Sequence, residues 1–113
     1  MDIDVREERD GEVLILVPVG RLDSANADSF ESVVMDHVGK GVRRMIVDFS
    51  RLDFVSSSGS RVLLIVAQAL KAEAGALVLC AMRDHIKEVF EVSGFSQIIA
   101  IRDSREEALT LAS

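Results

Sequence analysis

The sequence is poor in the features that mark secreted, membrane-spanning and disulfide-stabilised proteins. Cysteine occurs once, as Cys80, so no intramolecular disulfide can form. Because it lies within the apolar run GALVLCAM, we expect it to be buried and unreactive. The longest uninterrupted apolar run, VLILVPV at residues 13–19, is too short to span a bilayer, and the segment MDIDVREERDGE is charged where a signal peptide would be apolar. These absences predict a cytoplasmic protein without membrane insertion.

Basic clusters are also missing from the chain. The 13 Lys and Arg residues are scattered, and 19 Asp and Glu residues bring the formal net charge to −6. Nucleic-acid binding requires clustered basic side chains, so this composition opposes direct contact with nucleic acid. We therefore expect a protein partner or a small ligand. With 113 residues, of which 49% are hydrophobic, the chain suits a single domain over residues 1–113.

A hairpin is predicted at the beginning of the chain, over residues 2–20. Asp10-Gly11 is a two-residue turn signal, and the segment beyond it is rich in β-forming residues. Pro18, which has no backbone N–H to donate, indicates an edge or strand-end position for this part of the second strand.

Helix and strand patterns then alternate along the rest of the chain. Apolar residues at helical spacing predict four helices, and apolar runs predict three strands. In chain order we expect a helix at 26–38 with Ser24 as candidate N-cap, a strand at 42–49, a helix at 58–74, a strand at 77–81, a short helix ending near Gly94, a strand at 97–101, and a helix opened by a Ser104/Glu107 capping box. The order ββαβαβαβα predicts an α/β fold with a mixed, mostly parallel sheet, an N-terminal hairpin and about four helices.

Three serines and a glycine, Ser56-Ser57-Ser58-Gly59, separate a strand end from a helical pattern. In an α/β fold, the loop between the carboxyl end of a strand and the next helix is where ligands usually bind. One serine suffices as an N-cap, so the additional hydroxyls require a second explanation. A Walker A loop does not fit, because no lysine follows Gly59. The loop comes within one glycine of a G-x-S-x-G nucleophile elbow, for which His85 is the only downstream histidine.

A serine at a helix N-terminus can instead accept a phosphoryl group. A phosphoserine adds about two negative charges where backbone amides and the helix dipole accommodate them, so the fold survives while the outward surface changes. On the same helix, 100° spacing places Ser60, Arg61 and Leu64 opposite the expected core stripe. An exposed Leu64 with a polar rim is typical of a protein-docking surface. The core stripe is expected at Val62, Ile65, Val66, Ala69 and Leu70.

Three short motifs carry a family resemblance. Gly20-Arg21-Leu22-Asp23 resembles a G-x-L-D that follows the second strand, and Asp48-Phe49-Ser50 resembles a D-L-S that ends the third. Phe54-Val55-Ser56-Ser57-Ser58-Gly59 is similar to F-x-D-S-S-G. Together with the order of elements, these motifs resemble an anti-sigma factor antagonist of the STAS domain family, over most of the chain from residue 11 to residue 112.

The resemblance implies a phosphorylation-switched binding protein. In such proteins the first serine after the aspartate is phosphorylated by an ATP-dependent anti-sigma factor that is both partner and kinase. The acceptor would be Ser57, and Ser56, Ser58 and Gly59 would complete the switch loop. The unphosphorylated protein would sequester the kinase and so release a sigma factor, and a phosphatase would reverse the modification. The chain itself would not be an enzyme and would need no cofactor or metal, because the partner holds ATP and Mg²⁺.

A docking face is expected around the serine loop, made of Asp23, Arg61 and Leu64. From the residues alone, a cap beside the first helix is the favoured role of Asp23, whereas the resemblance favours a contact with the partner. Ser56 stands where the family usually has aspartate, so kinase recognition, the rate of phosphorylation or the choice of acceptor can differ. Two other interpretations stay open. One is a STAS scaffold or transporter-associated subunit without the switch, and the more distant one is a small serine hydrolase that uses His85.

Overall fold

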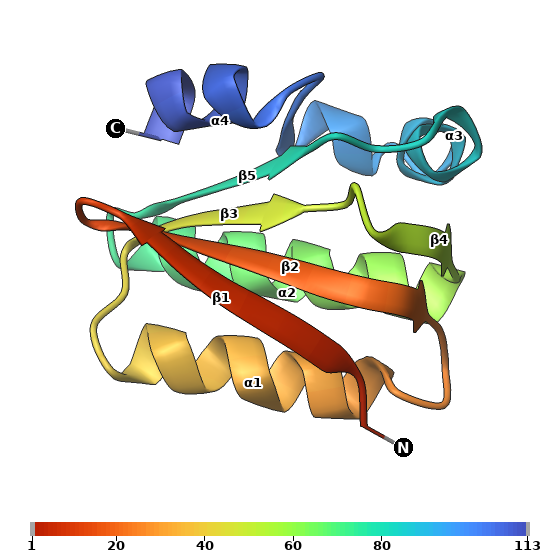
Figure 1. Ribbon diagram of the computed structural model, residues 1–113, viewed down its shortest axis with the longest axis horizontal. Coiled ribbons are helices and arrows are strands. Elements are labelled where there is room, and N and C mark those ends of the chain that lie inside the picture. Colours follow the sequence, from red (N-terminus) through yellow and green to blue (C-terminus); the bar gives the residue numbers. More distant parts are fainter. Residues whose placement is uncertain (1, 113) are drawn as a thin grey trace.

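One mixed sheet with helices on both faces makes up the part of the chain that the computed structural model describes, residues 2–112. Its elements are β1 (Asp4–Asp10), β2 (Val13–Leu22), α1 (Ala27–Gly39), β3 (Arg44–Asp48), β4 (Leu52–Val55), α2 (Ser57–Ala72), β5 (Ala76–Cys80), α3 (Asp84–Val92), the 3₁₀ turn η1 (Phe95–Gln97), β6 (Ala100–Arg102) and α4 (Arg105–Ala112) (Figure 1). No helix within these residues is long and apolar enough to cross a membrane.

The sheet has the strand order β1-β2-β3-β5-β6, and β4 pairs with β2 beyond the end of β3. β1 and β2 form the antiparallel hairpin, while β3, β4, β5 and β6 all pair in parallel. The α/β fold with a mostly parallel sheet and an N-terminal hairpin is therefore confirmed. The strand β4 is an addition to the predicted order.

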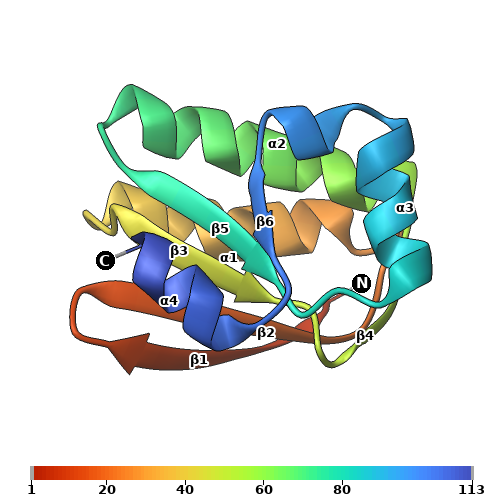
Figure 2. The same cartoon turned by 90° about the horizontal axis from the view of Figure 1, so that it is seen from above.

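Both faces of the sheet are covered, which explains the nearly continuous apolar strands. Along β2, Leu14 and Leu16 belong to the larger core beneath α1 and α2, whereas Val13, Ile15 and Val17 belong to a smaller core beneath α4. Figures 1 and 2 show α1 and α2 on one face and α4 on the other. Cys80 is fully buried in the smaller core, as expected, and burial raises the pKa of its thiol to about 12.

Pro18 does not lie on an edge strand, because β2 is an interior strand with β1 on one side. On the other side of β2, pairing with β3 ends at Leu16 and pairing with β4 begins at Gly20. Pro18 lies in the interval between these two partners, where the ladder on that side is interrupted. A residue without a backbone N–H is tolerated in this interval of an otherwise central strand.

The predicted strand at 97–101 has the wrong limits. Residues 95–97 form η1, and the backbone N–H groups of Ile98 and Ile99 donate to the carbonyl of Phe95 at 2.9 and 2.8 Å. These amides are therefore not available to a sheet, and β6 is only three residues long. Gly94, with φ of 81°, follows α3 as expected.

The core stripe of α2 was predicted only in part. Val62, Val66 and Leu70 are buried, but Ile65 is 37% exposed and Leu63, which was not expected in the core, is fully buried. The difference arises because α2 packs not only on the sheet but also against α1 on one flank and α3 on the other. The sequence pattern assumed that α2 buries a single face against the sheet, so it could not predict which residues the two neighbouring helices bury.

Candidate functional site

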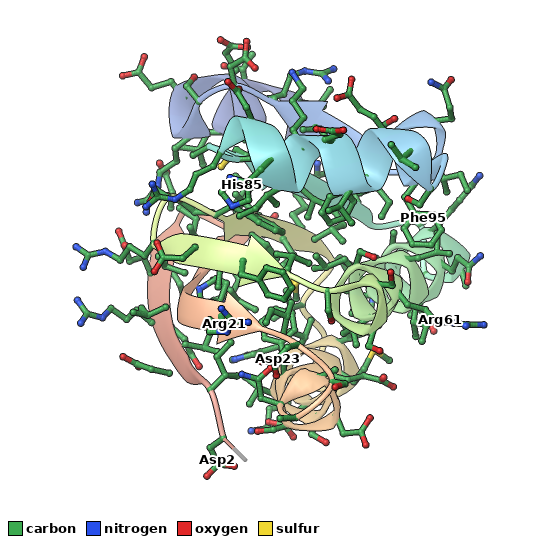
Figure 3. The ribbon with its side chains drawn as sticks, turned by 90° about the vertical axis from the view of Figure 1, so that its right-hand side faces the viewer. Asp2, Arg21, Asp23, Arg61, His85 and Phe95 are labelled. Carbon is green, nitrogen blue, oxygen red and sulfur yellow. The ribbon has the colours of Figure 1, made fainter. Side chains whose placement is uncertain are left out.

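The serine loop lies at the carboxyl end of β4, next to the end of β2. Val55 pairs with Leu22, and the amide of Ser56 donates to the carbonyl of Leu22 at 2.9 Å. The segment that follows Leu22 carries Asp23, so strand pairing brings two of the predicted site segments together. Figure 3 looks at this end of the molecule, with Arg21, Asp23, Arg61, His85 and Phe95 labelled.

The three consecutive serines have different structural roles. Ser56 is the N-cap of α2, and its hydroxyl oxygen accepts a hydrogen bond from the amide of Gly59 at 3.1 Å. Ser57 and Ser58 form the first turn of the helix and are exposed. Within residues 2–112, no hydrogen-bond partner is seen for either of these two hydroxyls. The cap therefore uses one hydroxyl and leaves two accessible.

Gly59 is required by a close contact between α2 and β2. A Cβ atom at this position would lie 2.8 Å from both the carbonyl oxygen and the Cγ atom of Leu22. Backbone atoms cannot yield as a flexible side chain can. The glycine thus allows the N-terminus of α2 to sit directly against the end of β2.

Asp23 organises the turn before α1. Its carboxylate accepts from the amide of Ala25 at 3.0 Å, and its carbonyl accepts from the amide of Ala27 at 2.9 Å. Asn26 is at the N-cap position and accepts from the amide of Asp23 through its side chain, so Ser24 is not the cap that the sequence suggested. The Asp23 carboxylate therefore stabilises the turn before α1 and does not cap the helix itself, while a contact of Asp23 with a partner stays a prediction.

Arg21 and Phe54 form a contact that the sequence did not predict. The guanidinium carbon of Arg21 lies 4.4 Å from the centre of the Phe54 ring, and its Nε atom lies 3.7 Å from a carboxylate oxygen of Asp23. The two residues are register partners in β2 and β4. The Phe54 ring and the Asp23 carboxylate thus hold the positively charged guanidinium of Arg21 beside the serine loop. Both residues belong to the quoted motifs, but only the pairing of β4 with β2 shows that they meet.

A groove of ≈ 790 Å³ runs between α2 and α3 and begins at the serine loop. The α2 side and the α3 side both contribute polar and apolar groups. Its lining residues are Ser57, Ser60, Arg61, Leu64, His85, Glu88, Val89, Val92, Ser93 and Phe95. The structure thus brings three predicted site residues, Ser57, Arg61 and Leu64, to one surface.

The predictions for Leu64 and Ser60 need correction. Leu64 was expected to be exposed, but it is half-buried and packs against the larger core while it lines the groove. Ser60 was placed on the polar face, yet it is only 2% exposed and donates its hydroxyl proton to the carbonyl oxygen of Ser57 at 2.9 Å. The flanking contact with α3 covers this side of α2. Truncation of Leu64 would therefore affect stability as well as any partner contact.

The α3 wall of the groove is a second part of the site that the sequence did not predict. Val92 is 80% exposed at the end of α3, although Ile86 and Phe90 of the same helix are fully buried. Phe90 packs edge-to-face on Phe49 with ring centres 5.9 Å apart, which fixes the helix against the core. In the sequence, Val92 could have been noticed as an apolar residue that lies outside the core stripe of a short helix. Only the approach of α3 to α2 makes it part of a groove.

His85 ties α3 to β4. Its Nε2 atom lies 2.7 Å from the carbonyl oxygen of Asp53, so Nε2 carries the proton that is donated. Arg83 adds a bond from Nε to the carbonyl of Leu52 at 3.0 Å. Among residues 2–112, no carboxylate orients His85 and no serine hydroxyl bonds to it, so a Ser-His-Asp arrangement is not assembled there. No cluster of three His, Cys, Asp or Glu side chains in this range could hold a metal ion.

Asp48, from the D-F-S motif, has a structural role. It is 4% exposed and accepts from the amide of Ser50 at 2.8 Å and from the guanidinium of Arg105 at 2.9 and 3.1 Å. Burial alone would raise the pKa of this carboxyl, but the bonds from Ser50 and Arg105 outweigh it and the pKa lies below its usual value. Arg105 also binds Glu8 and lowers the pKa of that carboxyl. The cluster joins α4, β3 and β1.

Comparison with known proteins gives consistent matches. The family model of the STAS domain matches residues 4–108. BtrV of Bordetella bronchiseptica, provisionally named an anti-sigma factor antagonist, is 46% identical over 96 residues, which are 85% of this chain and 83% of BtrV.

Solved structures share the fold. An anti-sigma factor antagonist from Mycobacterium paratuberculosis is 20% identical with a TM-score of 0.89, covering 98% of this chain and 94% of that one. The unphosphorylated form of the anti-sigma factor antagonist SpoIIAA is 24% identical with a TM-score of 0.74, covering 95% of this chain and 94% of that one.

Proposed function

We propose that this chain, which belongs to the STAS domain family, is an anti-sigma factor antagonist that binds an anti-sigma factor through the surface around its serine loop. The relative BtrV carries the provisional name of such an antagonist and matches most of the chain. The free hydroxyl of Ser57 at the start of α2, beside a groove, is the observation that carries the proposal. The action would be in the cytoplasm, and its effect on DNA would be indirect.

Ser57 is the proposed phosphoryl acceptor. It is exposed, its hydroxyl is not used by the cap, and it lines the groove, whereas Ser58 does not. A phosphate at this position would face the free amides and the positive end of the dipole of α2, so the fold can accommodate it. SpoIIAA, a structural neighbour, has been solved in a phosphorylated form. The kinase would be the anti-sigma factor, which would hold ATP and Mg²⁺, while this chain would supply only the serine.

Ser56 explains how the loop keeps its geometry without the usual aspartate of the family. Serine and aspartate are both good N-caps because each offers an oxygen to an amide of the first turn. The hydroxyl of Ser56 makes this bond to Gly59. The substitution therefore preserves the cap and removes one negative charge beside Ser57. If Ser57 is phosphorylated more slowly than the serine of a loop with aspartate, or is recognised differently, the cause would be the missing charge and not a change in the shape of the loop.

The switch would act on partner binding, not on folding. On a partner surface fitted to a neutral hydroxyl, a phosphate brings repulsion and desolvation. A cost of about 3–4 kcal/mol would weaken binding by ~10²- to 10³-fold. Asp23, Arg61 and Leu64 would contribute to the same docking surface.

Calorimetry with the cognate anti-sigma factor tests this proposal. Ser57→Asp is expected to weaken binding by ~10²- to 10³-fold and to leave the thermal midpoint nearly unchanged, since the side chain is exposed at a helix N-terminus. Thr110→Asp, an exposed hydroxyl residue on α4, is the control and should bind normally. Intact binding by Ser57→Asp would contradict the switch. Phosphopeptide mapping of the protein from its host would then favour the unphosphorylated scaffold if no serine at 56–58 is modified.

A further inference from the structure

We propose that the groove between α2 and α3 receives an apolar face of a helix of the anti-sigma factor, with Val92 as the main contact on the α3 side. This inference rests on the proposed function, because it names a second part of the same docking surface. The groove extends the proposed docking surface from the serine loop onto α3 and η1. Neither of these elements is part of the family motifs.

Exposed apolar side chains gather along the α3 side. Val92 lines the groove and is 80% exposed, the highest value among large hydrophobic residues within 2–112. Val89 and Phe95 line the groove and are half-buried. The other exposed apolar residues have smaller exposed fractions, and Phe54 is covered in part by Arg21. Water contact at Val92 would be removed by an apolar partner surface in the groove.

The rims of the groove carry charges of opposite sign. Arg61 lies on the α2 side and Glu88 on the α3 side, and neither has an ion-pair partner among the described residues. By contrast, Arg83 and Lys87, at the beginning and in the middle of α3, pair with Asp53 at 3.3 Å and Asp103 at 3.7 Å. The complementary occupant is an amphipathic helix with apolar residues towards Leu64 and Val92, a basic residue towards Glu88 and an acidic residue towards Arg61.

Continuity with the serine loop argues for the anti-sigma factor as the owner of this helix. Ser57 lines one end of the groove, so a kinase that reaches its hydroxyl also covers that end. A phosphate on Ser57 would then place its charge beside the bound helix. Docking in the groove and phosphorylation would thus oppose each other, which provides a direct route from modification to release.

Val92→Lys tests the proposal with the full-length protein. Lysine at this position lies in the last turn of α3 and four residues after Glu88, so the fold should tolerate it. Binding of the anti-sigma factor, measured by calorimetry, should weaken by about tenfold or more. Leu111→Lys is the matched control, since Leu111 is 44% exposed near the end of α4 on the other face of the sheet. It should bind as the unmodified chain does.

The possible outcomes separate this inference from the proposed function. If Ser57→Asp weakens binding and Val92→Lys does not, the groove proposal is wrong and the switch stands. If Val92→Lys weakens binding while Ser57→Asp does not, the groove is a docking site without the switch. A change in oligomeric state with Val92→Lys, seen by sedimentation without loss of partner binding, would assign the groove to a second copy of the chain and overturn the proposal. Glu88→Lys provides a second variant if Val92→Lys lowers the thermal midpoint.

Discussion

Asp48 and Ser57 lie at the carboxyl ends of consecutive strands, but their polar atoms are used in opposite ways. Asp48 is buried, and both of its oxygens accept hydrogen bonds from groups within the chain. Ser57 is exposed, and its hydroxyl has no partner within residues 2–112. A polar group that is satisfied internally stabilises the fold, whereas an accessible and unused one is available to a partner. The difference separates the structural motif from the motif that carries the proposed function.

The largest effect on folding is expected at the Asp48 cluster. Arg105→Ala would leave a carboxylate that is only 6% exposed without its cationic partner. Loss of one partner of a fully buried pair costs roughly 3–5 kcal/mol, and because Arg105 is partly exposed we expect about 2 kcal/mol. Denaturant unfolding measures this change, with Arg102→Ala as an exposed arginine control. Equal stability of the two variants would show that the Asp48 cluster does not contribute more than an ordinary surface arginine.

The same cluster predicts a dependence of stability on pH. The pKa of Asp48 is lower in the folded protein than its ordinary value of 3.8, so the folded state binds this proton less readily. Its ionised form therefore contributes stability above that value, and the contribution is lost as the pH falls through the lower pKa of the folded state. Glu8 has a lowered pKa as well and adds in the same direction. In Asp48→Asn the decline of the unfolding free energy below about pH 4 should be shallower. An unchanged acid slope would contradict the role of Asp48.

The smallest changes in the unfolding free energy are expected for alanine substitutions in the serine loop. Their order distinguishes the capping serine from the two serines with free hydroxyls. Ser56→Ala removes the bond to the amide of Gly59 and should cost about 1 kcal/mol of unfolding free energy. Ser57→Ala and Ser58→Ala remove exposed hydroxyls and should change stability by less than about 0.5 kcal/mol. Chemical denaturation of the three variants under one condition checks the order. If Ser57→Ala is the most destabilised of the three, the assignment of Ser56 as the cap is wrong.

Much of the fold was accessible from local patterns. The hairpin, the four helices and the three apolar strands follow from periodicity and turn residues, because each of these signals acts within a few residues. β4 could not be recognised from periodicity because it is four residues long, with Asp53 and Phe54 exposed in its middle. The limits of β6 were also wrong, since the local bonds of η1 compete with strand pairing.

The candidate site was predictable only where it depends on a motif. The serine loop and Asp23 are recognisable in the sequence because they stand at a strand end and at a helix start. The Arg21–Phe54 contact and the position of Leu64 are not, since they depend on how β4 pairs with β2 and how α3 packs on α2. An isolated helix pattern shows which residues share a face but does not show how many neighbours the helix has.

The sequence by itself determined the α/β class, the position of the serine loop before α2 and the family resemblance, because strand and helix periodicity and short motifs are local properties. Only the tertiary structure decided that Ser56 is the cap while the hydroxyl of Ser57 stays free. It also decided that Arg105 of α4 donates hydrogen bonds to Asp48. The same holds for the position of α3 as the second wall of a groove beside Ser57. These features join residues that are far apart in the chain or differ only in a side-chain partner. Burial and hydrogen bonding are decided by the packed structure, so local patterns cannot assign them.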